Sequence, residues 1–153
     1  MTDTGFSGSS DYPFTDPQLA RLIQHLTPKV RGITPGSFHH GSAMFRDDAA
    51  GWQAHLLGYW VVVHPPTDPK KRAYSYCDEI MPEAPYLRRN RHLVRAVRRM
   101  LFAPHWNVEP PAGKRGDGTL STMNLARRMR KPGIVIRPNG SEYDLLTGEE
   151  LEV

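Results

Sequence analysis

The spacing of apolar side chains predicts two helices in the first part of the chain. Residues 15–28 open with Thr15 or Asp16 as a cap, and Pro28 ends the pattern. Between them, apolar residues recur every three or four positions, as a half-buried helix requires: Leu19, Leu22, Ile23 and Leu26. Residues 46–58 predict a second helix, with acidic residues in the first turn and a glycine at the end.

Other segments follow the pattern of strands and loops. The run YWVVVH at residues 59–64 predicts a strand that is covered on both faces and is ended by two prolines. Residues 100–104 and 134–136 predict brief buried strands, and residues 34–42 a turn followed by a very short apolar piece. Residues 65–85 form a long, proline-broken connection, which we expect to be a loop or a lid.

A third helix, predicted at residues 86–99, separates an apolar stripe from an arginine-rich face. Asn90 falls within the apolar stripe. A buried amide without a partner costs roughly 1–3 kcal/mol, so we expect Asn90 to hydrogen-bond at the first turn of the helix or to tie two backbone loops together. Arg89 lies on the flank of the stripe, away from the other arginines, and its planar guanidinium group suits a phosphate at the edge of the sheet.

The order of these elements predicts a three-layer α/β domain. Strand–helix units with short links are typical of a mostly parallel sheet covered by helices on both faces. The 153 residues are enough for one compact core and few for two, so we expect a single domain over residues 1–153. Residues 138–153 predict a hairpin-like C-terminal addition with a turn at Asn139-Gly140.

Ligands of such sheets bind at the carboxyl ends of the strands, where the following helices present their N-termini. Four stretches of small or hydrogen-bonding residues are expected there: 5–10, 38–42, the start of the helix at 86, and 115–122. Each alone is ordinary turn chemistry, whereas together they indicate a nucleotide-like ligand. We expect the ligand to contact Gly8, Ser9, Ser10, His40, Gly41, Ser42, Arg89, Asn90, Arg115, Gly116, Asp117, Gly118, Thr119 and Thr122. The glycines, Ser9 and Thr119 would cradle phosphate and Arg89 would neutralise it, while Asn90, Ser42 and Thr122 would position the rest.

Composition and charge narrow the choice of partner. A hydrophobic fraction of 39% and a mean hydropathy of -0.54 are typical of a soluble globular protein. No apolar run approaches the roughly 18 residues of a membrane span, and the polar start does not resemble a signal peptide. The single cysteine, Cys77, fits a reducing cytoplasm. The net charge of +4, with basic residues clustered at 88–99 and 127–131, favours phosphate-bearing partners, although such clusters are commonly solvated helix faces.

Several other chemistries have weaker support. No pair among the histidines and neighbouring acids has the spacing of a zinc helix motif, so no metal or other cofactor is expected; these residues are His39, His40, His55, His64, Asp47 and Asp48. His40 more simply orients its loop or touches the ligand. Cys77 lies in the long loop and indicates an ordinary thiol rather than a nucleophile. The stretch GFSGS is not the G-x-S-x-G elbow of α/β-hydrolases.

The motifs themselves carry a family resemblance. GFSGS near the start, FHHG before a helix, VVVHPPTDPKKRA, APYLRRNRHLV, LFAP and RGDGTLSTMNLARRMRKPGIVI occur in an order that resembles the SLOG superfamily. That superfamily groups LOG-type phosphoribohydrolases, DprA-like proteins and small bacterial or phage-borne relatives. The resemblance covers nearly the whole chain. It implies a Rossmann-like fold whose glycine-rich turns hold a nucleotide or a nucleotide-derived signal, and a homo-oligomer.

The resemblance also bears on catalysis. Enzymes of the superfamily hydrolyse the N-glycosidic bond of nucleoside monophosphates with a P-G-G-x-G-T-x-x-E turn and an arginine from the preceding helix. By resemblance Arg89 matches that arginine and Gly118-Thr119 matches the G-T, but Thr122 stands where the enzymes have glutamate. An oxocarbenium-like transition state needs a carboxylate, and Asp117 precedes the helix instead of lying one turn into it. The missing glutamate favours a non-catalytic protein that senses or sequesters its ligand. The resemblance implies that this ligand is an NAD-derived or cyclic nucleotide signal, used in antiviral defence or captured by a phage.

Two alternatives stay open. One is phosphoribohydrolase activity on nucleoside 5′-monophosphates. The other is single-stranded nucleic-acid binding, because the arginine face at 88–99 suits a phosphate backbone and DprA-like relatives bind single strands; against it, no aromatic residues alternate with the arginines as stacking platforms. Lys70, Lys71 and Arg72 in the long loop could close over either ligand.

Overall fold

The computed structural model describes residues 3–30, 32–111 and 118–152. The elements follow one another as β1 (Thr4–Gly8), α1 (Asp16–Leu26), β2 (Ser37–His40), α2 (Arg46–Leu56), β3 (Trp60–Val63), the 3₁₀ turn η1 (Pro69–Lys71), β4 (Glu79–Ile80), α3 (Tyr86–Ala96), β5 (Arg99–Ala103), α4 (Gly118–Arg128), β6 (Gly133–Ile136), β7 (Glu142–Asp144) and β8 (Glu150–Leu151). Helices and strands alternate through most of this order, as the sequence predicts.

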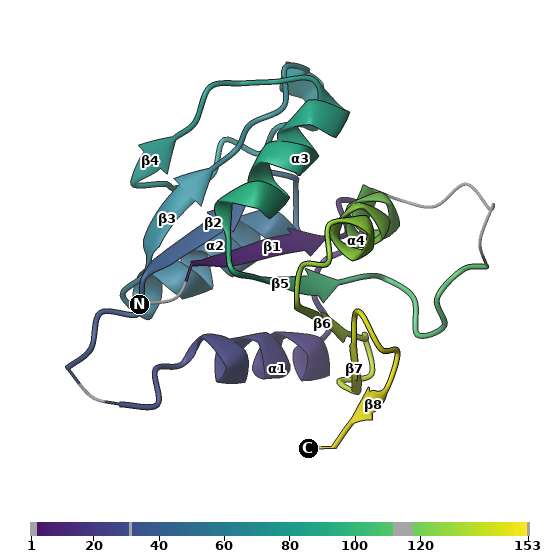
Figure 1. Ribbon diagram of the computed structural model, residues 1–153. Coiled ribbons are helices and arrows are strands. Elements are labelled where there is room, and N and C mark those ends of the chain that lie inside the picture. Colours follow the sequence, from purple (N-terminus) through teal and green to yellow (C-terminus); the bar gives the residue numbers. More distant parts are fainter. Residues whose placement is uncertain (1–2, 31, 112–117, 153) are drawn as a thin grey trace.

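Over the described ranges, the strands form one eight-stranded sheet in the order β4-β3-β2-β1-β5-β6-β7-β8. β1 to β6 are parallel, and β7 and β8 extend the sheet in antiparallel fashion (Figure 1). The chain moves outward from β1 to β4, and α3 then carries it back across the sheet to β5, on the other side of β1. The strand order therefore reverses between β1 and β5, and open α/β sheets bind ligands beside such a reversal.

Two clusters of buried side chains cover the two faces of the sheet. One lies between the sheet and helices α1 and α2, and the other between the sheet and helices α3 and α4. Along β5, Leu101 and Ala103 belong to the first cluster, whereas Met100 and Phe102 belong to the second, as the two-residue period of a strand requires. The prediction of a three-layer α/β fold with a mostly parallel sheet is confirmed.

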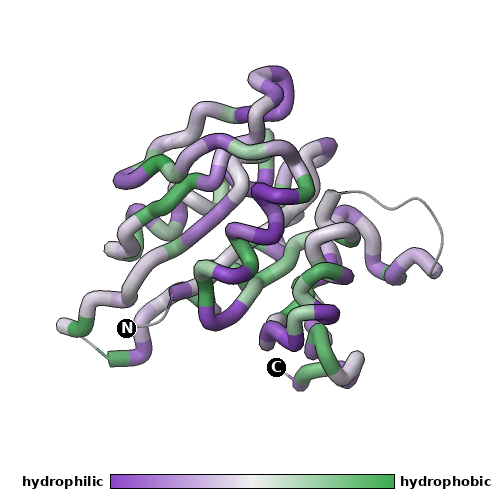
Figure 2. Tube along the Cα trace, turned by 45° about the horizontal axis from the view of Figure 1, so that its top comes forward, coloured by the Kyte–Doolittle hydropathy of each residue, from purple (hydrophilic) through white to green (hydrophobic). Residues whose placement is uncertain are grey.

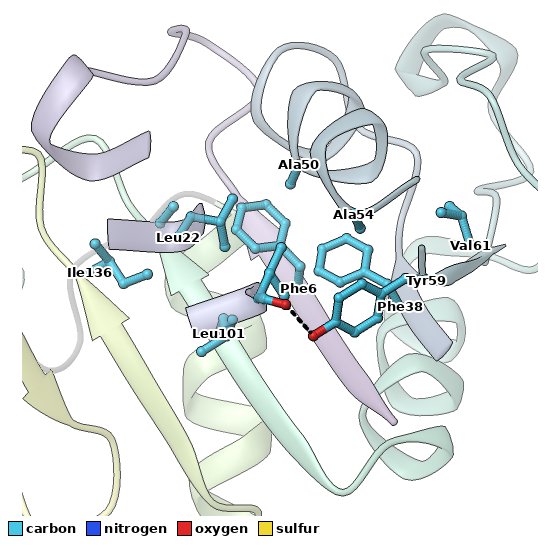
Figure 3. Packing of buried hydrophobic residues seen from close by; sticks show 11 residues of the cluster. Phe6, Leu22, Phe38, Ala50, Ala54, Tyr59, Val61, Leu101 and Ile136 are labelled. Carbon is cyan, nitrogen blue, oxygen red and sulfur yellow. Dashed lines mark hydrogen bonds between the residues drawn. The ribbon is translucent and has the colours of Figure 1, made fainter. Parts of the chain in front are cut away.

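Figure 3 shows the first cluster, in which aromatic rings from β1 and β2 fill the space under α2. Phe6 and Phe38 are fully buried, with ring centroids 6.0 Å apart, and burial of a side chain of this size contributes roughly 1.5–3 kcal/mol. The Tyr59 hydroxyl donates a 2.8 Å hydrogen bond to the Leu26 carbonyl, which joins the start of β3 to the end of α1.

The helices each bury one face, and Figure 2 shows how hydrophilic and hydrophobic residues alternate along them. α1 begins as predicted: the Thr15 side chain accepts a hydrogen bond from the Gln18 amide, and proline occupies the first turn. Gln18 itself is fully buried and donates to the carbonyls of Pro104 and Ile136, so it ties α1 to the ends of β5 and β6. No described helix is long and apolar enough to cross a bilayer.

Two segments differ from the sequence-based predictions. The first stretch, expected as a glycine-rich turn from residue 5, contains β1, the strand that pairs with both β2 and β5. A side chain at Gly5 would collide with Met100, so the glycine is needed for close packing. The helix predicted at 86–99 ends at Ala96; Arg99 belongs to β5 and donates to the Thr4 hydroxyl and the His25 carbonyl instead of joining the arginine face.

Residues 65–85, expected as a loop or a lid, contain η1 and β4, and β4 pairs with β3 as the edge strand of the sheet. Pro66 and Ala84 form an isolated parallel bridge, so the two ends of the connection are adjacent. Its middle is held by a 2.7 Å hydrogen bond from the Ala73 amide to the Ser42 carbonyl, next to the end of β2. This arrangement carries Lys70 and Lys71 to the carboxyl edge of the sheet.

Candidate functional site

A cavity of about 330 Å³ lies at the carboxyl ends of β1 and β2. Its walls come from the segment after β1, the turn between β2 and α2, η1, and the first turns of α3 and α4. The residues predicted from the sequence that line it are Gly8, Ser9, Ser10, Gly41, Arg89, Asn90, Gly118, Thr119 and Thr122. Stretches far apart in the chain therefore converge on one cavity at the expected edge.

The other predicted residues do not line this cavity or cannot be placed. His40 and Ser42 are fully buried and do not line the cavity. The His40 ring packs directly against Gly51 of α2, and its Nδ1 accepts a 3.0 Å hydrogen bond from the Ser42 amide. Burial, aided by nearby His64 and Arg89, lowers the pKa of His40 to about 3, so the ring is neutral and shapes the turn after β2. Arg115, Gly116 and Asp117 lie outside the described residues.

Asp47 is held in the site by the protein backbone. Its carboxylate accepts three backbone hydrogen bonds, from Gly8 at 3.0 Å, Gly41 at 3.1 Å and Ala43 at 3.2 Å. Burial raises the pKa of Asp47 to about 6, and Arg89 and the amides act in the opposite direction. The amides of Gly8 and Gly41 were predicted to cradle phosphate; they bind this carboxylate instead.

Arg89 lines the cavity but is engaged inside the protein. Nη1 donates to the carbonyls of Gly41 and His64, and Nε donates to Asn90 Oδ1 at 2.8 Å. Desolvation lowers the pKa of Arg89, and the nearby Asp47 acts in the opposite direction. The guanidinium group stays charged, because arginine is not deprotonated in proteins. Arg89 therefore links α3 to the ends of β2 and β3 and places a positive charge beside the cavity.

Two buried polar groups of the cavity wall have no hydrogen-bond partner among the described residues. They are Asn90 Nδ2 and Thr119 Oγ1, on the first turns of α3 and α4, and their residues are only 4% and 2% exposed. Buried polar atoms are nearly always satisfied, because an unsatisfied one costs about 1–3 kcal/mol. Both residues line the cavity.

The cationic side of the cavity is built around Tyr86. Lys71 Nζ lies 5.7 Å from the centre of its ring and the Arg89 guanidinium 5.2 Å from it, so two cations lie close to the ring. A methyl group at Gly118 would collide with the Tyr86 hydroxyl, so the missing side chain lets the first turns of α3 and α4 meet. Lys70 and Lys71 complete this wall.

Sequence analysis missed several cavity residues. Asp47 was considered only as an acid near a helix start and as a weakly supported metal ligand, and Tyr86 only as part of the apolar stripe of the helix predicted at 86–99. Ser7, Asp11, Ala43, Met44 and Leu93 also line the cavity without having been predicted. A signal for Asp47 existed, since an acid in the first turn of a helix that follows a glycine turn is placed to accept hydrogen bonds from that turn.

Fold and site together define a Rossmann-like α/β domain with a polar cavity at the carboxyl edge of its sheet. No family model matches the chain, and no curated protein matches its sequence. Among solved structures, the chain is similar to the molybdenum cofactor binding protein from the phototrophic bacterium Rippkaea orientalis, with a TM-score of 0.61 and 18% identity over 89% of this chain and 76% of that one. At this identity the likeness supports the fold alone.

Proposed function

We propose that this protein binds a phosphate-bearing, nucleotide-derived small molecule in the cavity, without transforming it. The observation that carries the proposal is the pair of unpartnered groups, Asn90 Nδ2 and Thr119 Oγ1, beside the cations Lys70, Lys71 and Arg89. An amide N–H donor and a hydroxyl at two helix N-termini are the groups that hold a phosphate oxygen. The fold neighbour is described as binding a cofactor, which agrees with a small-molecule role for this architecture.

The size of the cavity limits the ligand. About 330 Å³ is near the lower end of the roughly 300–1,000 Å³ typical of small-molecule sites. This volume suits a mononucleotide-sized molecule better than an extended dinucleotide. The hydroxyls of the walls and the apolar Met44 and Leu93 provide contacts for a sugar and a base.

The resemblance to the SLOG superfamily refines this proposal. On that basis the ligand is a nucleotide signal such as an NAD-derived or cyclic nucleotide, which a bacterial or phage-encoded protein senses or sequesters as a homo-oligomer in the cytoplasm. Such a protein needs affinity for its ligand and no catalytic carboxylate, in agreement with Thr122 at the position of the enzymes' glutamate. Thr122 Oγ1 donates within its own helix, to the Gly118 carbonyl at 3.0 Å.

One observation favours a second candidate, the hydrolysis of nucleoside monophosphates. Asp47 places a carboxylate in the cavity wall, a group that the sequence comparison with the enzymes lacked. Its hydrogen bonds to three amides hold it in a structural role, which is why binding without turnover is preferred. Incubation with nucleoside monophosphates, monitored for free base, separates the two candidates; turnover that Asp47→Asn abolishes would establish the hydrolase.

Titration calorimetry with the ribonucleoside 5′-monophosphates tests binding itself. Thr119→Val replaces the hydroxyl by a methyl group of similar size, and we expect it to weaken binding about tenfold, the value of one hydrogen bond to a charged group. The matched control is Thr147→Val, on the exposed turn before β8, which should bind as the wild type does. No binding by the wild type, or equal effects of the two substitutions, would contradict the proposal. Tight binding of oligonucleotides with a steep salt dependence would instead favour the nucleic-acid alternative.

A further inference from the structure

The end of the cavity that is richest in backbone amides is already filled by a side chain of the protein. The amides of Gly8, at the end of β1, and of Gly41 and Ala43, after β2, all point at the Asp47 carboxylate. Converging amides of this kind form an anion site, and a phosphate would bind them in the same way. Here the anion is supplied by α2 itself.

We propose that Asp47 acts as a built-in anion that occupies these amides and restricts the ligand to one phosphate group, held instead by Lys70, Lys71 and the first turns of α3 and α4. The inference rests on the proposed function, because it concerns the ligand of the same site. It predicts a ligand with one phosphate group and an otherwise uncharged remainder, such as a nucleoside monophosphate or a cyclic mononucleotide. Among the signals named above, it therefore excludes an NAD-derived diphosphate.

The backbone is shaped around the carboxylate. Ser42 and Phe45 have φ angles of 59° and 63°, a left-handed conformation that is unfavourable for residues other than glycine. The turn that contains them directs the Gly41 and Ala43 amides to the same oxygen, Asp47 Oδ2. A side chain on Gly41 would press against both the Arg89 guanidinium and Asp47 Oδ2, so glycine lets these groups approach. Unfavourable backbone held by such contacts is typical of functional sites.

Charge then distinguishes Asp47 from the lysines of the cavity wall. Three backbone amides donate to the Asp47 carboxylate and nearby Arg89 is positive, and both favour its ionised form. Arg89 itself is bonded to two carbonyls and to Asn90. A second anion that displaced or approached Asp47 at these amides would meet a like charge in a partly desolvated site, where repulsion is much stronger than in water. Elsewhere the cavity wall offers Lys70, Lys71 and the unpartnered groups of Asn90 and Thr119, all of which suit an anion.

The Asp47 carboxylate also has acceptor capacity left for a neutral group. Oδ1 accepts one backbone hydrogen bond, from Gly8, and a carboxylate oxygen can accept two. A sugar hydroxyl can therefore donate to Asp47 while the phosphate lies at the cationic wall. This orientation favours a nucleoside monophosphate over a nucleoside bisphosphate, whose second phosphate would face Asp47.

Paired titrations test the inference. Wild-type protein, Asp47→Asn and the control Asp48→Asn, an exposed acid one residue further along α2, are titrated with the four ribonucleoside 5′-monophosphates and the matching 3′,5′-bisphosphates. We expect the wild type and Asp48→Asn to prefer the monophosphate by roughly tenfold or more, a cost consistent with like charges a few ångströms apart near a surface. In Asp47→Asn, which keeps one acceptor oxygen and loses the charge, the preference should fall below about threefold.

The outcomes separate this inference from the proposed function. Equal wild-type affinity for the two classes, or a wild-type preference for bisphosphates, overturns the role of Asp47 while phosphate binding stands. An unchanged preference in folded Asp47→Asn overturns it as well. Absence of wild-type binding to every monophosphate overturns both. If Asp47→Asn does not fold, the wild-type titrations decide alone: a preference for the monophosphates supports the inference, and equal affinity for the two classes overturns it.

Discussion

Replacement of Arg46 should destabilise the fold by disconnecting the loop after β1 from the end of β5. Arg46 is 2% exposed, and its guanidinium group donates to the carbonyls of Tyr12, Pro13, Ala103 and Pro104. These bonds hold the segment after β1, which forms one wall of the cavity. Methionine keeps an unbranched side chain at this position and donates no hydrogen bond.

The size of the destabilisation depends on which hydrogen bonds each of these carbonyls keeps in the variant. Ala103 still accepts from the Ser9 amide and Pro104 from the Gln18 side chain, so neither is left unsatisfied. Tyr12 and Pro13 lie in part-buried surroundings that water can reach. With four hydrogen bonds to a charged group worth about 1.5–3 kcal/mol each and half of the loss offset, Arg46→Met should cost about 3–6 kcal/mol. For a domain of this size that lowers Tm by roughly 6–24 °C.

Urea unfolding followed by fluorescence measures this change, because the chain contains three tryptophans. The midpoint should fall with an unchanged slope, and the control Arg91→Met, on the exposed face of α3, should alter stability by less than about 0.5 kcal/mol. A loss below about 1 kcal/mol for Arg46→Met would refute the reasoning, since it would mean that water replaces the guanidinium at every carbonyl.

Two further predictions concern packing and pH. Gly118→Ala should lower the free energy of unfolding by about 1–3 kcal/mol, because the new methyl group meets the Tyr86 hydroxyl. Adding Tyr86→Phe to the same chain should recover part of that loss. Additive effects in the double-mutant cycle would argue against the contact. Burial lowers the pKa of His40 from 6.5 to about 3, so in acid the residue takes up a proton when the protein unfolds. The contribution of His40 to the free energy of unfolding is therefore complete above pH 6.5 and declines as the pH falls towards 3. Between pH 7 and 5, protonation of this residue should lower the free energy of unfolding by about 2 kcal/mol, as measured by urea unfolding. His40→Asn keeps an acceptor for the Ser42 amide and should flatten the dependence of stability on pH. An equally steep dependence in that variant would contradict the assignment.

Local signals in the sequence are sufficient for the elements with their own periodicity. α1, with its Thr15 cap, and β3, with its valine run, follow from propensity and spacing. β1 does not, because the residues TGFSG lack the β-branched side chains of a typical strand. It is a central strand because glycine fits under Met100 and Phe6 fills the cluster below α2, and both of those contacts are tertiary.

The candidate site shows the same difference between local sequence signals and tertiary contacts. The residues that follow the strands were predicted from topology, since parallel strands end at one edge. Asp47 was not predicted as a site residue, because its partners Gly8 and Gly41 are 39 and 6 residues away in the chain and meet it only in the folded sheet. The engagement of Arg89 by the carbonyls of Gly41 and His64 is likewise a property of the packed structure.

Mass spectrometry of small molecules released from purified, heat-denatured protein tests the central claim most directly. The account predicts a phosphate-containing, nucleotide-sized compound in the wild-type supernatant, and its depletion when Thr119→Val and Asn90→Leu are combined, relative to a Thr147→Val control prepared in parallel. No such compound in the wild type, or equal amounts in all three preparations, would contradict a ligand held by the first turns of α3 and α4.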